Sequence, residues 1–91
     1  MEVRYTFTSY LNYRVAESEE MAKAVTEALK RFVACDWGKV NQEDKEANNR
    51  DLVNREGHVL ARYDSPEGDI YINLEFSEDE NIACIMFVDE Y

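Results

Sequence analysis

The side chains that could do chemistry are few in this sequence. It contains one histidine, His58, and two cysteines, Cys35 and Cys84. Catalysis needs such groups brought together in a cleft, and no nucleophile signature or glycine-rich phosphate loop surrounds them. Their spacing is not that of a zinc site, and the acidic turn Glu78–Glu80 lacks the alternating carboxylates of an EF-hand loop. The sequence therefore predicts no catalytic residue, no metal site and no cofactor.

Acidic residues are concentrated in the last third of the chain. The formal charge of −10 comes from 20 acids and 10 bases, and every Lys and Arg lies between Arg4 and Arg62. Residues 63–91 contain nine acids and no base. This charge disfavours direct binding to nucleic acid, whose phosphates are also negative.

These carboxylates have two interpretations. They can be solvated turn residues that keep the protein soluble and prevent strands from pairing edge to edge. Alternatively, they can bind a basic groove on a partner protein and occupy the place of nucleic-acid phosphates there. The residues expected to form such a binding surface are Asp64, Glu67, Asp69, Glu75, Glu78, Asp79 and Glu80.

The elements that position these residues follow from the hydrophobic periodicity. Residues Val3–Thr8 alternate apolar with polar side chains, which predicts a strand, and Tyr10–Val15 are expected to continue it irregularly. A long helix is expected next, because Ser18 can cap it and Gly38 can end it. Apolar residues recur there at spacings of three and four, and the face they form comprises Met21, Val25, Ala28, Leu29, Phe32 and Val33.

A second, peripheral helix is expected over residues 42–55, between a cap at Asn41 and a stop at Gly57. The period then changes to two, which predicts three strands joined by short turns: Val59–Tyr63, Asp69–Phe76 and Ile82–Val88. The expected fold is therefore α+β, one domain over residues 1–91 with the order β-α-α-β-β-β. Its sheet is antiparallel, with a C-terminal three-stranded meander and two helices packed on one face.

Several single residues add to this picture. Trp37 lies in the turn between the two expected helices, where it either fills the core or serves as an aromatic anchor for a partner. Cys35 and Cys84 are flanked by apolar residues and are expected to be buried free thiols in a reducing compartment. No apolar run is long enough to span a bilayer, and Met1–Tyr10 is too polar for a signal peptide, so a cytoplasmic protein is expected.

A resemblance extends over about the last two thirds of the chain. The residues that carry it include Asp36-Trp37-Gly38, then Glu43-Asp44, Ala47-Asn48, Leu52, Gly57, Leu60, Tyr63 and the ending Asp89-Glu90-Tyr91. This pattern resembles small proteins without an established activity that bacterial plasmids, integrated elements and phages encode. Where those proteins have a Trp-Ile-Ile-Thr-Glu-like strand and an Asp-Arg-Ser turn, this chain has residues 71–75 and an acidic turn at 77–80. The resemblance implies a genetic setting rather than a mechanism.

Small acidic proteins of mobile elements often block host defence, some by imitating the charge of DNA. By that analogy, the leading hypothesis is a non-enzymatic protein in the bacterial cytoplasm that binds and inhibits a basic, nucleic-acid-handling host protein, such as a CRISPR effector. The alternative is a structural or regulatory module that forms a homodimer through an exposed sheet edge, its acidity serving solubility. An enzyme would instead predict a deep polar cleft with perturbed titratable groups.

Overall fold

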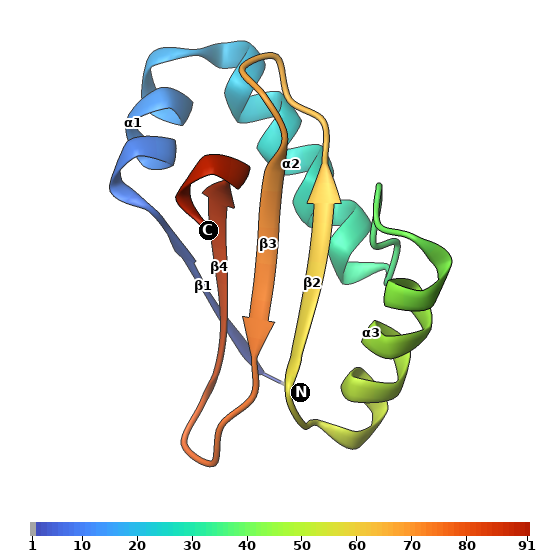
Figure 1. The fold of residues 1–91 in the computed structure, drawn as a ribbon. Helices are drawn as coiled ribbons and strands as arrows, with labels where there is room; N and C mark the ends of the chain where they lie inside the picture. The colour runs from blue at the N-terminus through green and yellow to red at the C-terminus, as the bar shows by residue number, and fades with distance from the viewer. Residues whose placement is uncertain (1) are drawn as a thin grey trace.

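The computed structural model describes residues 2–91. Its elements, in chain order, are β1 (Val3–Phe7), α1 (Ser9–Glu17), α2 (Glu19–Val33), α3 (Gln42–Asn54), β2 (His58–Tyr63), β3 (Ile70–Glu75), β4 (Asn81–Phe87) and a short 3-10 helix, η1 (Val88–Glu90). The expected α+β class is confirmed, with three α-helices and one four-stranded sheet in the described chain (Figure 1).

The sheet has the strand order β1-β4-β3-β2. Strands β2, β3 and β4 pair antiparallel, so the C-terminal meander expected from the short turns is confirmed. The expectation of a fully antiparallel sheet was wrong, because β1 pairs parallel to β4, with Phe7 opposite Ile85. No short turn joins β1 to β4, so nothing in the local sequence fixes their relative direction.

The long helix α2 lies across one face of this sheet, and the short helix η1 lies on the opposite side at the end of β4 (Figure 1). The apolar side of α2 contributes Met21, Val25, Ala28 and Phe32 to the core, where they meet the inward side chains of β2, β3 and β4. The core face was predicted correctly for these four residues. The prediction that Val33 belongs to this face was wrong, because its side chain is 69% exposed at the end of the helix.

The segment after β1 is a helix rather than the irregular strand that the sequence predicted. Thr8 caps α1, its Oγ1 accepting a hydrogen bond from the Leu11 amide at 3.4 Å. Leu11 is fully buried and Val15, four residues later, packs against the core, whereas Tyr13 is exposed. The apparent alternation of Leu11 and Tyr13 therefore concealed a helical spacing of four, which tertiary packing selected.

The third helix lies alongside β2 rather than across the sheet (Figure 1), and its Leu52 packs against the core. Asn41 caps it as expected, accepting from the Asp44 amide at 2.7 Å. Its one buried residue is Asn48, whose side-chain amide pairs with the backbone of Leu60: Nδ2 donates to the carbonyl at 2.9 Å and Oδ1 accepts from the amide at 3.2 Å. The asparagine thereby substitutes for a neighbouring strand at the β2 edge.

A second contact closes the same edge two residues further along. The Lys39 amide donates to the Arg62 carbonyl at 2.7 Å, and the Arg62 amide donates to the Trp37 carbonyl at 3.1 Å. Gly38 lies between these bonds with φ of +76°, and a Cβ there would overlap the Arg62 carbonyl oxygen. We call Trp37–Lys39 together with Asn48 the β2 clasp, because they occupy the outward backbone groups of Leu60 and Arg62.

Candidate functional site

The seven carboxylates predicted to bind a partner do not form one surface. Asp64, Glu67 and Asp69 belong to the turn before β3, and we call them the β2–β3 acids. Glu75, Glu78, Asp79 and Glu80 lie at the end of β3 and in the turn after it, and we call them the β3–β4 acids. The two turns lie at opposite ends of β3 (Figure 1), which a six-residue strand separates by roughly 20 Å.

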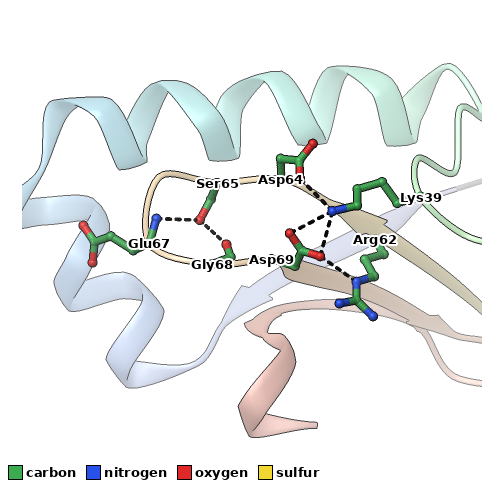
Figure 2. A network of polar contacts seen from close by, with 7 residues as sticks. All are labelled: Lys39, Arg62, Asp64, Ser65, Glu67, Gly68 and Asp69. Carbon is green, nitrogen blue, oxygen red and sulfur yellow. Dashed lines mark hydrogen bonds and ion pairs between the residues drawn. The ribbon is translucent and has the colours of Figure 1, made fainter.

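The β2–β3 acids are held by basic residues of the same chain. Lys39 Nζ lies 2.7 Å from Asp64 Oδ1 and 3.0 Å from Asp69 Oδ2, and Arg62 Nε lies 2.8 Å from the same Asp69 oxygen (Figure 2). Arg14 binds Glu67 through two hydrogen bonds, of 2.6 and 3.0 Å. This group therefore fastens the β2–β3 turn to the segment before α3 and to α1.

The charge state of this group follows from the same contacts. Hydrogen bonds from Lys39 and then Arg62 lower the pKa of the Asp69 carboxyl below its ordinary value, and the bond from Arg14 lowers the pKa of Glu67. Both carboxylates are thus ionised and neutralised within the fold. A partner's basic groove would have to displace these internal partners, which makes the β2–β3 acids poor candidates for the binding surface.

The β3–β4 acids differ in being exposed and largely unpaired. Glu75, Glu78 and Asp79 form no ion pair with any residue in the range 2–91, and Glu80 has a single, solvent-exposed contact with Arg4 at 3.5 Å. The turn itself is ordered by Ser77, whose Oγ accepts from the Glu80 amide at 3.1 Å and donates to the carbonyl of the same residue. These carboxylates are therefore presented to solvent on a defined loop.

A groove of about 560 Å³ lies beside this loop. Its lining includes Asp79 and Glu80 from the turn, Glu2 and Arg4 from the start of the chain, and Arg55 from the end of α3. The mixture of carboxylates and guanidinium groups makes this groove polar. We take this end of the sheet, the β3–β4 acids and the adjoining groove, as the candidate binding site.

Trp37, the other residue considered for binding, is only 3% exposed and belongs to the core. Its indole N–H donates to Asn49 Oδ1 at 2.9 Å, and its ring meets Phe32 edge to face at 5.3 Å between centroids. The neighbouring Asp36 carbonyl accepts a hydrogen bond from the Tyr63 hydroxyl at 2.7 Å. Trp37 thus belongs to the core and to the β2 clasp, and its ring is not presented as an anchor.

The cysteines are free, but the expectation that both are buried was wrong. Cys35 is exposed, because it follows α2 in a left-handed turn with φ of 62°, and Cys84 is half-buried on the face of the sheet opposite α2. Over residues 2–91, no group of three His, Cys, Asp or Glu side chains is arranged to hold a metal ion. None of the helices in that range is both long and apolar enough to cross a membrane.

Sequence reasoning missed the residues that organise these surfaces. Lys39 and Arg62 could be recognised as bases near an acidic turn, but their convergence on Asp69 depends on the sheet register. Asn48 gave a clearer signal, since a polar residue occupied the side of α3 where an apolar one would pack. No protein-family model, curated protein or solved structure matches the chain significantly.

Proposed function

We propose that this protein is a non-enzymatic binder of a basic, nucleic-acid-handling protein, and that the β3–β4 acids occupy a groove on that partner which otherwise holds phosphates. The observation that supports it is the contrast between the two acidic turns. One is neutralised by Lys39, Arg62 and Arg14, whereas the other leaves Glu75, Glu78 and Asp79 without a described ion partner. Unpaired carboxylates on an ordered loop steer a basic partner at little desolvation cost.

The proposal narrows the binding surface expected from the sequence. Binding rests on the exposed Glu75, Glu78, Asp79 and Glu80, while the β2–β3 acids keep a structural role in the turn. The bacterial setting and the inhibition of a defence effector come from the resemblance and the analogy, so they are proposed as the biological context of the same binding activity.

Charge reversal tests this proposal. In the test variant, Glu75, Glu78 and Asp79 are replaced by Lys, which changes the net charge by +6. In the matched control, the exposed helical residues Glu17, Glu27 and Glu46 are replaced by Lys, with the same change in net charge. Each purified protein is immobilised, nuclease-treated bacterial lysate is passed over it, and retained proteins are eluted with a salt gradient.

We expect the wild type and the control to retain the same basic protein, and the test variant to lose it. The retained protein should also release labelled DNA when the wild type is added. Equal retention by the test and control variants would contradict a specific role for the β3–β4 acids, and circular dichroism establishes that both variants are folded.

Self-association is the second candidate function, because β1 is an exposed edge strand. The charge of −10 on each copy opposes such a dimer in low salt. Light scattering over a range of protein and salt concentrations separates the two functions. A concentration-dependent dimer that becomes stronger as salt is added would favour self-association.

A further inference from the structure

The outer side of β1 is an open sheet edge. The Thr8 amide donates to the Ile85 carbonyl at 3.1 Å, so the backbone groups of Arg4 and Thr6 also face β4. In a parallel ladder the intervening residues direct theirs away from the neighbour, which here means Val3, Tyr5 and Phe7. Within residues 2–91, no hydrogen bond satisfies these outward groups, whereas the β2 clasp occupies the opposite edge of the sheet.

An apolar groove of about 220 Å³ runs beside this edge. It lies between β1 and the end of α2, and its lining includes Tyr5, Val33 and Leu52. Tyr5 is 37% exposed and Val33 is 69% exposed. A strand added to β1 would therefore place every second side chain on the side where this groove lies.

The polar groove of the candidate site continues from the apolar one. Val3 lines both, and beyond it the larger groove is bordered by the carboxylates of Glu2, Asp79 and Glu80 and by the guanidinium groups of Arg4 and Arg55. One extended segment lying along β1 would thus meet apolar surface in its middle and a charged border toward one end. Three carboxylates against two guanidinium groups leave this border with a net negative charge, and with the charge of −10 on the chain it favours Lys or Arg at that end of the segment.

We propose that β1 is a docking edge for an extended segment of a basic partner protein, which adds to the sheet as a fifth strand. Its backbone pairs with the outward groups of Tyr5 and Phe7, its alternate apolar side chains enter the groove beside Tyr5, and a basic side chain reaches Asp79 and Glu80. The class of partner rests on the proposed function, while the docking edge rests on the geometry of β1. A second copy of this chain is the less favoured occupant, since it would bring another ten negative charges.

Two substitutions at one position separate backbone docking from side-chain contact. Tyr5→Pro removes the outward N–H and leaves the bonds between β1 and β4 in place, since edge strands accept proline where the N–H faces solvent. Tyr5→Ala removes the same aromatic ring but keeps the N–H. The probe is a fluorescent peptide of seven alternating Val and Thr residues with a Lys at each end, and a second peptide has Glu at each end.

We expect the Lys peptide to bind the wild type at least tenfold more tightly than the Glu peptide, as measured by anisotropy. Tyr5→Pro should weaken binding at least tenfold more than Tyr5→Ala does. In the wild type, the peptide should also slow hydrogen exchange of the Tyr5 and Phe7 amides. This last measurement decides the question if Tyr5→Pro does not fold, and unchanged exchange would overturn the proposal.

Other outcomes would overturn the proposal as well. Equal binding to both Tyr5 variants, or equal binding of both peptides, would contradict strand addition by a basic segment. A dimer in sedimentation equilibrium that Tyr5→Pro abolishes would assign the edge to a second copy instead. If Tyr5→Pro still retains the basic protein that charge reversal of the β3–β4 acids releases, the docking edge fails and the proposed function stands. If the Lys peptide docks but no basic protein is retained, the docking edge stands and the proposed function fails.

Discussion

Replacing Asn48 with Ala tests whether one side chain closes the β2 edge. Asn48 is 6% exposed, and its amide makes two hydrogen bonds to the backbone of Leu60. Each such bond contributes about 1 kcal/mol net, and leaving the Leu60 groups without a partner costs about 1 kcal/mol more. Alanine has a higher helix propensity than asparagine, which offsets about 0.6 kcal/mol of this loss in α3. The expected loss of unfolding free energy is therefore about 2 to 3 kcal/mol.

This loss should appear as a lower thermal midpoint. For a domain of this size, 1 kcal/mol corresponds to about 5 °C, so Asn48→Ala should lower the midpoint by about 10 to 15 °C. Unfolding is followed by circular dichroism, with denaturant titration to obtain the free energy. Asn54→Ala, at the exposed end of the same helix, is the control and should differ from the wild type by no more than the gain in helix propensity of about 0.6 kcal/mol.

The result that would refute this reasoning is a change in Asn48→Ala no larger than in the control. It would mean that water replaces the side chain at the Leu60 backbone without cost, and that the β2 edge needs no clasp. Hydrogen exchange gives an independent check, because only the Leu60 amide loses its acceptor in this variant.

Three further predictions concern the clasp and the ion pairs beside it. Gly38→Ala should lower the free energy of unfolding, measured by denaturant titration, by about 3 kcal/mol. Residue 38 has a left-handed backbone conformation, and the new Cβ would overlap the Arg62 carbonyl oxygen. An unchanged midpoint would contradict the clasp geometry. Asp69→Asn should lower the free energy of unfolding at pH 7. Because the hydrogen bond from Lys39 lowers the pKa of Asp69 in the folded state, the difference from wild type in thermal scans should begin to shrink as the pH falls below about 4 and should be lost once the pH is below that lowered pKa. A difference that stays constant as the pH falls from about 4 to about 2 would show that the ion pair is not its source. Trp37→Phe should reduce the near-ultraviolet circular dichroism signal. It should also lower the free energy of unfolding by about 1 to 3 kcal/mol, because the indole hydrogen bond to Asn49 is lost. An unchanged free energy of unfolding would place the ring outside the core.

The local sequence was sufficient for most of the secondary structure. Ser18 and Asn41 cap α2 and α3 as predicted, because an N-cap depends on residues within one turn. The meander was predictable for the same reason, since short turns force neighbouring strands to run antiparallel. The segment Tyr10–Val15 was mistaken because a short apolar pattern suits both a strand and a helix.

The candidate site was only partly predictable. The acidic composition of residues 63–91 identified the carboxylates, but their two sets of neighbours came from elements distant in the sequence. Arg14 and Lys39 reach the β2–β3 acids from α1 and from the segment before α3. A charge count cannot distinguish a carboxylate that is paired across the fold from one that faces solvent.

The sequence by itself determined the α+β class, most of the core face of α2, the N-caps of α2 and α3 and the antiparallel meander, because each depends on contacts between near neighbours. It placed the ends of both helices too late: α2 ends at Val33 rather than near Gly38, and α3 ends at Asn54 with Arg55 in the left-handed conformation. Only the tertiary structure decided that β1 lies parallel to β4, that α3 closes the β2 edge through Asn48, and that one acidic turn is neutralised while the other is free. These features join residues that are far apart along the chain. Their geometry is set by how the sheet and helices pack together, and no local pattern contains it.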